Sequence, residues 1–467
     1  MNCVVRALEQ AKIHPERMAL WTPSHGSVCF QEMLELSLRA QKLFYDKGIR
    51  SGDHVLLAIT PGPEMFASIL ALLGLGAPVL LIEPWLKVER INHIVNLVKP
   101  KAFITGALGR VWGMRSQSIR KIPNWISPRQ ILKNEKMSSF HIEQLDPTAR
   151  AILAFTSGTT GASKGIIRSQ QYLWDMHEII SAHEDQGYSK PDLSVFANLA
   201  LYHLGTGRGA VLVPHNWNTL ALNRIAALPK EIQPETLTCG PGFLQHLLKH
   251  EGFSNLKSFY VGGALTDCSL FEEAFSRFTS AKFHHVYGGS EAEPVASIDA
   301  RSAVKTSRES GYFQTLHIGK PISVLTHRIQ NDSLWVAGPN VCPEYLDAPE
   351  ENRALKETDN SGRVWHNMGD RVLETDSGWK YSGRSQQSLQ DFDLEQKIYS
   401  LIGSSKCFIH RNTAGEATLV GEQLGHSATM IKRTFHGIDH IVERTIKRDK
   451  RHRARIDRAA TTRGFKQ

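Results

Sequence analysis

The sequence lacks the cysteine pattern of a zinc site or of a disulfide scaffold. Its six cysteines are scattered over 467 residues, without a C-x-x-C pair and without histidines at zinc-ligand spacing. The opening stretch, MNCVVRALEQAKIHPER, also lacks the apolar core of a signal peptide. We therefore expect free thiols, no zinc and a cytoplasmic location.

Long hydrophobic runs are scarce as well. One uncharged stretch, residues 65–82, reaches the length of a membrane span. Gly74, Gly76 and Pro78 divide it into a helix-sized piece and a short strand-sized piece. We expect a buried helix, turn and strand of an α/β core, and no transmembrane segment.

Outside the C-terminal region, positive and negative charges nearly balance. The net charge is +9, and the segment from Arg444 to the end, the basic tail, contributes +8 with ten Lys or Arg against Asp449 and Asp457. Such a segment predicts either an acidic partner or a solvated charged surface. Nucleic acid is disfavoured because Phe465 is the one aromatic residue of the tail that could stack on a base.

The rest of the chain alternates between helix-like and strand-like segments. Helices are expected at residues 30–45 and 91–98, and strands at 54–60, 102–105, 151–155, 193–199, 236–239, 258–261 and 283–286. This repetition predicts an α/β fold with mostly parallel sheets. After about residue 310, short strands with turns indicate a β-rich subdomain. We expect a large N-terminal domain, 1–383, and a small α+β C-terminal domain, 384–467.

The strongest motif is AILAFTSGTTGASKG, in which a strand-like run ends in a Gly/Ser/Thr loop. Its glycines let backbone N–H groups turn toward an anion, its hydroxyls add donors, and Lys164 adds a positive charge, as a triphosphate requires. It differs from a Walker A loop because Ser163 precedes the lysine. The residues expected at the phosphates are Thr156, Ser157, Gly158, Thr159, Thr160, Gly161 and Lys164.

Further motifs follow in a fixed order. They are Gly262-Gly263-Ala264, Tyr287-Gly288-Gly289-Ser290-Glu291, Met368-Gly369-Asp370 and Gly383-Arg384. With the TSGTTGASKG loop they resemble the phosphate loop, the segment beside the adenine, the YGxTE motif, the xGD motif and the hinge GR of the adenylate-forming superfamily. That superfamily includes acyl-CoA synthetases, luciferases and nonribosomal adenylation domains. The resemblance implies a two-domain enzyme that joins a carboxylate to the α-phosphate of ATP and expels pyrophosphate.

The resemblance also implies a role for each matched residue. Lys164 would neutralise the leaving phosphates, and Glu291 would hold Mg²⁺, a cation that prefers oxygen ligands. Tyr287 offers a flat face to adenine. Asp370 offers two acceptor oxygens to the ribose hydroxyls, and Arg384 would reach ribose or phosphate with its forked donors. The residues that complete the nucleotide site would be Gly263, Ala264, Gly288 and Ser290.

Several longer stretches resemble the β-lactone synthetases of bacterial olefin biosynthesis and their fatty-acid ligase relatives. They are YGGSEAEPVA (287–296), VWHNMGD (364–370), DLSVFANLALYHLGTGRGAVLVP (192–214) and IKRDKRHRARID (446–457). This implies a fatty or β-hydroxy fatty acid as substrate. The acyl-adenylate would then close to a β-lactone through its own hydroxyl, which proximity favours. Otherwise it would pass to a thiol of CoA or of an acyl carrier protein that the basic tail attracts.

The chain departs from the superfamily pattern at several positions. Ser163 replaces the usual proline of the phosphate loop, and Gln386 and Gln390 replace a hinge residue and a motif lysine. Arg455 stands where the C-terminal domain supplies a catalytic lysine, and arginine is longer, planar and forked, so the exchange is not conservative in a tight site.

These departures leave two questions open. Lys447 or Lys450 could take the role of the missing lysine, and otherwise the chain is a degenerate nucleotide-binding pseudoenzyme that acts through partner recognition. His203 lies where the superfamily often lines the acyl pocket, and it is equally consistent with a core histidine.

Overall fold

The computed structural model describes the chain of 467 residues except residues 84, 158–162, 185–189, 449–455, 464 and 466–467. Two compact units share this chain. The first consists of Met1–Leu237 and Pro339–Val364, and the second of Thr238–Gly338 and Trp365–Gln467. The expected border at residue 384 stays a prediction.

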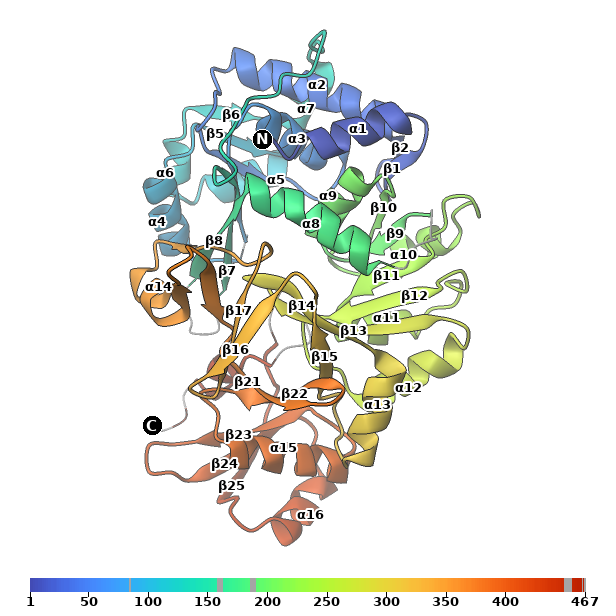
Figure 1. Cartoon of the computed structure of the whole chain (residues 1–467), viewed down its shortest axis with the longest axis vertical. Coiled ribbons are helices and arrows are strands. Elements are labelled where there is room, and N and C mark those ends of the chain that lie inside the picture. The colour runs from blue at the N-terminus through green and yellow to red at the C-terminus, as the bar shows by residue number, and fades with distance from the viewer. Residues whose placement is uncertain (84, 158–162, 185–189, 449–455, 464, 466–467) are drawn as a thin grey trace. The chain divides into compact units, whose positions relative to one another are not determined.

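Seven strands form a sheet in the first unit, in the order β18-β8-β7-β4-β3-β5-β6 (Figure 1). The pairs from β7 through β6 are parallel, whereas β7–β8 and β8–β18 are antiparallel. The strands are β3 (Val55–Ala58), β4 (Val79–Ile82), β5 (Ala102–Thr105), β6 (Asn124–Ile126), β7 (Arg150–Ser157), β8 (Ser163–Ser169) and β18 (Tyr345–Leu346). The apolar runs of the parallel strands suit a sheet that helices cover.

Helices pack on this sheet. On one face, α4 (Val88–Val98) and α6 (Gln117–Arg120) place Ile94 and Ile119 in one core cluster with Leu56 and Phe103. The stretch at residues 65–82 forms α3 (Pro63–Gly74), whose apolar side chains are buried, and then β4, which confirms the expected helix, turn and strand. Among the described residues, none of the helices combines the length and the apolar character needed to cross a membrane.

The remaining helices of the first unit flank these strands along the chain. They are α1 (Val5–Ile13), α2 (Phe30–Asp46), α5 (Ala107–Gly113), α7 (Pro128–Lys133), α8 (Gln170–His183), α9 (Ala197–Thr206), α10 (Thr219–Ala226) and α14 (Pro349–Leu355). The expected helices at 30–45 and 91–98 correspond to α2 and α4.

A second group of strands in the first unit runs in the order β2-β1-β10-β9. These are β1 (Met18–Thr22), β2 (Gly26–Cys29), β9 (Asp192–Ser194) and β10 (Ala210–Leu212). The expectation of a strand over 193–199 was wrong in its second half, because the chain turns after Ser194 and enters α9 at Ala197. The strand β19 (Lys356–Thr358) also belongs to this unit, and β11 (Thr236–Cys239) carries the chain into the second unit.

The second unit contains the strand order β12-β13-β14-β15-β22-β21. The pair β12–β13 is parallel and the later pairs are antiparallel. The strands are β12 (Ser258–Gly262), β13 (Lys282–Gly289), β14 (Ala292–Asp299), β15 (His317–Pro321), β21 (Asp370–Thr375) and β22 (Gly378–Arg384). The helix α11 (Pro241–Leu247) precedes these strands in sequence, and α12 (Cys268–Arg277) and α13 (Ala300–Glu309) lie between them.

The second unit also includes a small antiparallel group and the C-terminal elements (Figure 1). The strands β16 (Thr326–Gln330), β17 (Ser333–Ala337) and β20 (Val364–Asn367) pair in that order. After β22 come α15 (Leu389–Ile402), β23 (Cys407–Arg411), β24 (Ala417–Gly421), α16 (His426–Thr434), β25 (His440–Glu443) and α17 (Arg458–Thr462). Large parallel-rich sheets with smaller β groups confirm the expected α/β fold class.

Candidate active site

Three of the expected nucleotide-binding side chains meet in the second unit. The Tyr287 hydroxyl donates a hydrogen bond to Asp370 Oδ2 at 2.6 Å, and Arg384 Nη1 lies 3.0 Å from Asp370 Oδ1. Asp370 is only 5% exposed. Strand pairing explains this meeting, because Asp370 opens β21 opposite Arg384, which ends β22.

Two glycines provide the backbone conformations that bring the Asp370 and Arg384 side chains together. Gly369 and Gly383 directly precede Asp370 and Arg384, and both adopt left-handed backbone conformations, with φ of 67° and 95°. Gly369 N–H also donates to Asn367 Oδ1 at 2.8 Å. Glycine occupies such conformations at no steric cost, so the two G-D and G-R dipeptides are needed for the turn as well as for the chemistry.

The cluster fixes the protonation of its members. Burial, together with the Asp370 carboxylate, raises the pKa of Tyr287 well above its usual value, so the hydroxyl keeps its proton and donates. Burial alone would lower the pKa of Arg384, but the Asp370 carboxylate outweighs this effect and the pKa is raised. The Asp370 carboxylate therefore lies between a hydroxyl that keeps its proton and a guanidinium that keeps its charge.

The YGGSE motif forms the hairpin between β13 and β14. Gly289 pairs with Ala292, which leaves Ser290 and Glu291 as its two-residue turn. A Cβ atom on Gly289 would lie 3.5 Å from Glu291 Oε2 and 3.7 Å from Met368 Cε, so the half-buried Glu291 carboxylate lies near the segment that leads into Asp370. Gly288 precedes this turn, inside β13.

The GGA motif continues β12 next to β13. Gly262 pairs with Val286, and a Cβ on Gly262 would come within 2.5 Å of the Val286 carbonyl oxygen. Gly263 then turns with φ of 84°, and Ala264 follows it directly. The second unit thus places the GGA segment after β12 and Tyr287 on the adjacent strand β13.

Lys164 lies in the first unit, on β8 opposite Thr156 of β7. It is 5% exposed, and its ammonium is 5.2 Å from the ring centroid of Tyr345 on β18. The Lys356 ammonium lies at the same distance from that ring. Among the described residues, no carboxylate forms an ion pair with Lys164. Because a buried cation is costly without an anion, this arrangement favours an anionic ligand at Lys164.

Part of the phosphate loop and the C-terminal arginine are outside these observations. Gly158, Thr159, Thr160, Gly161 and Arg455 lie outside the described residues. Thr156 and Ser157 end β7, and Ser163 begins β8, so the two strands bracket the loop.

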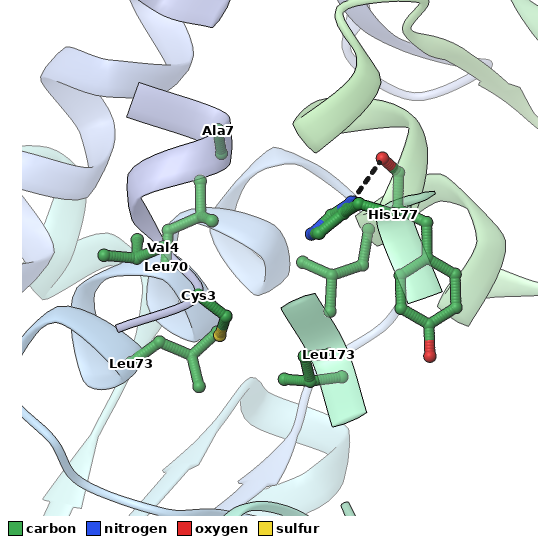
Figure 2. A pocket seen from close by; sticks show the side chains of 9 residues that line it. Cys3, Val4, Ala7, Leu70, Leu73, Leu173 and His177 are labelled. Carbon is green, nitrogen blue, oxygen red and sulfur yellow. Dashed lines mark hydrogen bonds between the residues drawn. The ribbon is translucent and has the colours of Figure 1, made fainter. Parts of the chain in front are cut away.

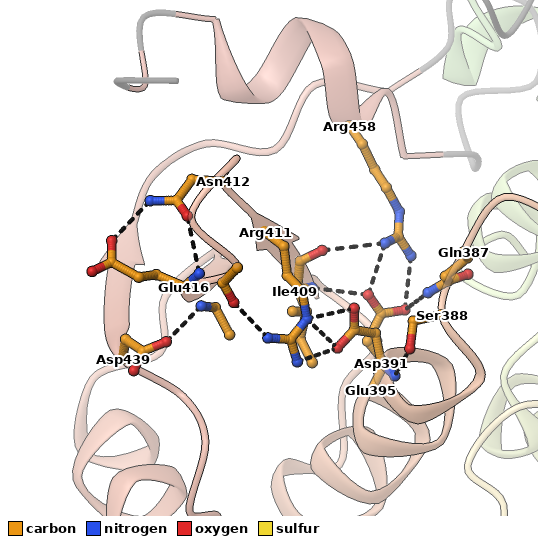
Figure 3. A network of polar contacts seen from close by, with 12 residues as sticks. Gln387, Ser388, Asp391, Glu395, Ile409, Arg411, Asn412, Glu416, Asp439 and Arg458 are labelled. Atoms are coloured by element: carbon orange, nitrogen blue, oxygen red, sulfur yellow. Dashed lines mark hydrogen bonds and ion pairs between the residues drawn. The ribbon is translucent and has the colours of Figure 1, made fainter.

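The segment after residue 455 is held by a polar network that the sequence did not reveal (Figure 3). Arg458 donates to both oxygens of Glu395, at 2.8 and 2.7 Å, and the Ile409 N–H donates to Glu395 Oε1 at 2.8 Å. Glu395 is 2% exposed. Arg448 and Ile456 form a β-bridge with each other.

His203 belongs to the core. It is fully buried, and its Nε2 lies 3.5 Å from both Glu184 Oε1 and Asp192 Oδ2. Burial opposes its protonation, but the two carboxylates outweigh burial and raise the pKa of His203. Arg208 completes the cluster by pairing with Glu184 and donating to Thr236 Oγ1.

A small apolar cavity lies close to this cluster in the first unit (Figure 2). Its lining includes Cys3, Leu73, Leu173 and His177. The volume of about 10 Å³ is at the limit for a single water molecule, which excludes an acyl chain. It is a packing defect rather than a substrate pocket.

Comparison with known proteins agrees with these motifs. The family model described as "AMP-binding enzyme" matches residues 8–346. An olefin β-lactone synthetase of Xanthomonas campestris pv. campestris is 24% identical over 417 residues, covering 77% of this chain and 74% of that enzyme. A dimodular nonribosomal peptide synthase of Bacillus subtilis is 27% identical over 190 residues, covering 38% of this chain and 8% of that much longer protein.

Solved structures share the fold. The anthranilate CoA ligase AuaEII, in complex with anthranoyl-AMP, superposes with a TM-score of 0.79 over 98% of this chain and 96% of its own. The sequence identity is 15%, so this likeness concerns the fold alone.

Proposed function

The chain belongs to the AMP-binding enzyme family and is an adenylate-forming enzyme that activates carboxylic acids, and we propose that its acid is a fatty or β-hydroxy fatty acid. The acid carboxylate attacks the α-phosphorus of ATP, the bond to the β-phosphate oxygen breaks, and pyrophosphate leaves. The product is an acyl-adenylate. Similarity to the olefin β-lactone synthetase supports this acid class.

The observation that carries the proposal is the Tyr287–Asp370–Arg384 cluster. A carboxylate has about four lone-pair sites, and Tyr287 and Arg384 occupy two of them. The remaining sites suit the two ribose hydroxyls of ATP. The Arg384 guanidinium stays charged beside them and suits the ribose or a phosphate oxygen. We assign adenine to the flat face of Tyr287 and to Gly263 and Ala264, with Gly288 and Ser290 completing the pocket.

We assign the neutralisation of the ATP phosphates to Lys164. Its buried ammonium lacks a carboxylate among the described residues, so it can neutralise the leaving β- and γ-phosphates without first breaking an ion pair. We assign the loop residues Thr156, Ser157, Gly158, Thr159, Thr160 and Gly161 to the same phosphates. When bound, Mg²⁺ would supply further neutralisation at the phosphate oxygens.

Glu291 is the residue that would hold Mg²⁺. The described residues contain no group of three or more His, Cys, Asp or Glu that could enclose a metal ion. A single carboxylate still fits Mg²⁺, because this ion commonly takes one or two carboxylates and completes its shell with phosphate oxygens and water. Glu291 at the tip of its hairpin meets that requirement.

The second step consumes the acyl-adenylate in one of two ways. With a β-hydroxy acid, the hydroxyl oxygen attacks the acyl carbon, AMP leaves with the bonding electrons, the hydroxyl proton is lost, and a four-membered lactone closes. With a thiol acceptor, the thiolate of CoA or of an acyl carrier protein attacks the same carbon, AMP leaves with the bonding electrons, and a thioester forms. We assign recruitment of such an acidic acceptor to the basic tail, and the contact with the α-phosphate to Arg455.

The test is acid-dependent exchange of labelled pyrophosphate into ATP, with fatty, β-hydroxy fatty and aromatic acids. Exchange with fatty or β-hydroxy fatty acids is the expected result, and release of a neutral lactone would identify the second step. Exchange with aromatic acids alone would overturn the acid class. No exchange with any acid, in protein that binds ATP, would overturn the enzyme proposal.

The second candidate function is a nucleotide-binding pseudoenzyme, and Arg455 is the observation that favours it. In that case Arg455→Lys would create exchange that the wild type lacks. If arginine is a working substitution, the same variant would lower an activity that the wild type already has.

A further inference from the structure

Three large apolar side chains project from α5 and the residue that follows it. Leu108, Val111 and Met114 are 88%, 67% and 57% exposed. Elsewhere in the described chain, strongly exposed apolar side chains occur one to an element, as Ile13 does in α1 and Leu220 in α10. Scattered apolar side chains are normal on a soluble surface, but three within seven residues form a patch.

The side of α5 that carries Gly109, Trp112 and Gly113 packs on the first unit. Trp112 packs on the core cluster that contains Phe103. A Cβ on Gly113 would lie 2.8 Å from Phe103 Cε1, and one on Gly109 would lie 1.8 Å from Thr105 Oγ1, so the helix sits as close as glycine allows. With 3.6 residues per turn, the face opposite these contacts carries Leu108, Val111 and Met114.

The charged residues of the surrounding sequence are all Lys or Arg. Residues 90–134 contain nine Lys or Arg and no Asp or Glu. Arg90 and Lys101 form ion pairs with Asp347 and Asp53. Among the described residues, no carboxylate pairs with the other seven. Four of them lie within the patch or within seven residues after it in the sequence and are exposed: Arg110, Arg115, Arg120 and Lys121.

We propose that this α5 patch docks the protein on an anionic lipid bilayer. Leu108, Val111 and Met114 enter the boundary between headgroups and acyl chains, and the four flanking cations contact lipid phosphates. Exposed apolar side chains flanked by Lys and Arg are the pattern of interfacial helices on anionic membranes. A stable protein partner would need roughly 800 Å² on each side, which two side chains on a seven-residue helix and one directly after it do not offer.

The proposal is independent of the ligase activity, so binding is measured directly. The full-length chain is sedimented with vesicles of phosphatidylcholine mixed with an equal amount of phosphatidylglycerol, and with vesicles of phosphatidylcholine alone. We expect binding to the anionic vesicles that weakens as NaCl is raised. The Leu108→Glu/Val111→Glu variant should bind at least about tenfold more weakly, because it loses apolar burial and repels lipid phosphate.

Two further variants make the test specific. Arg120→Gln/Lys121→Gln should weaken binding to anionic vesicles about tenfold while leaving the apolar side chains in place. Ile13→Glu is the matched control, since Ile13 is 63% exposed but its sequence neighbours Glu9, Lys12, Glu16 and Arg17 balance in charge. It should bind as the wild type does.

Four results would overturn the proposal. They are no binding to anionic vesicles, equal binding to phosphatidylcholine alone, full binding by both α5-region variants, and equal loss in Ile13→Glu. Full binding by both variants would assign the membrane contact to the basic tail. Sedimentation velocity adds a fifth: a wild-type dimer that Leu108→Glu/Val111→Glu converts to monomer would make a second copy of this chain the occupant of the patch.

Discussion

At the scale of single residues, Asp370 is the residue that joins the other expected nucleotide-binding side chains. It accepts from Tyr287, pairs with Arg384 and is nearly buried. We expect Asp370→Asn to lower the rate of pyrophosphate exchange at least about tenfold, because an amide supplies no charge to Arg384 and one acceptor oxygen fewer.

The matched control for this substitution is Asp376→Asn, an exposed position in the turn between β21 and β22. It makes the same chemical change in the same hairpin and should keep wild-type exchange. Equal rates for Asp370→Asn and the wild type would contradict the assignment of Asp370 to ribose.

We expect Lys164 to lower the stability of the ligand-free protein and to strengthen the binding of ATP. Removing a buried cation that has no carboxylate among the described residues relieves a desolvation cost, so Lys164→Met should melt at the same or a higher temperature than the wild type without ligand. ATP should raise the melting temperature of the wild type and raise that of Lys164→Met less. Thermal scans with and without ATP measure both effects, and an unchanged ATP shift in the variant would remove Lys164 from the phosphate site.

His177 gives a prediction about pH. Burial lowers its pKa to about 4, and its Nδ1–H donates to the Tyr202 carbonyl at 3.1 Å (Figure 2). The unfolded chain takes up this proton near pH 6.5 and the folded chain only near pH 4, so the contribution of His177 is complete above pH 6.5. It is lost as the pH falls from about 6.5 to about 4, by up to about 3 kcal/mol.

Urea unfolding of the wild type and of His177→Gln across this pH range tests the sign. The difference in unfolding free energy should shrink toward low pH, because only the wild type carries this linkage. The exposed histidine variant His440→Gln serves as control. A difference that grows as the pH falls would show that the folded state keeps His177 protonated.

At the scale of elements, the contact between α15 and α17 holds the end of the chain. Glu395→Gln should lower the unfolding free energy by about 2 kcal/mol, less than for a fully buried pair because the Arg458 side chain is 41% exposed. It should also speed tryptic cleavage in the basic tail. The control is Glu443→Gln at an exposed position at the end of β25, which should change neither quantity. Equal stability and equal cleavage in Glu395→Gln would refute the anchoring role.

The bounds of the helices and strands also show which elements the sequence patterns could predict. Helix α2 and strand β5 agree with expectation to within a residue, because one has a clear amphipathic repeat and the other is a short apolar run next to glycine and lysine. The apolar run at residues 193–199 gave a wrong expectation. Apolar residues continue from β9 toward α9, and such a run fits a strand as well as a helix. Length alone separates the two, and the boundary at Ser194 is set by the tertiary fold.

At the scale of the whole molecule, the family could be predicted from ordered local motifs, and the fold class from the alternation of helix-like and strand-like segments. The motifs assigned Tyr287, Asp370 and Arg384 to one nucleotide site, but the pairing of their side chains is seen only in the structure, within the second unit. Tyr345, Lys356 and Glu395 were missed. No local pattern marks them: Tyr345 and Glu395 meet Lys164 and Arg458 from distant parts of the chain, and Lys356 belongs to none of the motifs.

The first unit is assembled from two stretches of chain, and this has a consequence for its synthesis. Strand β18 pairs with β8, as Tyr345 with Ile166, although the chain builds six strands of the second unit, β12 to β17, between them. On the ribosome, β8 is therefore made long before the strand that covers it, and its N–H and C=O groups form an open edge meanwhile. A nascent chain that stalls before residue 345 carries its phosphate-loop lysine on an uncapped strand, where pairing with another nascent chain competes with correct folding.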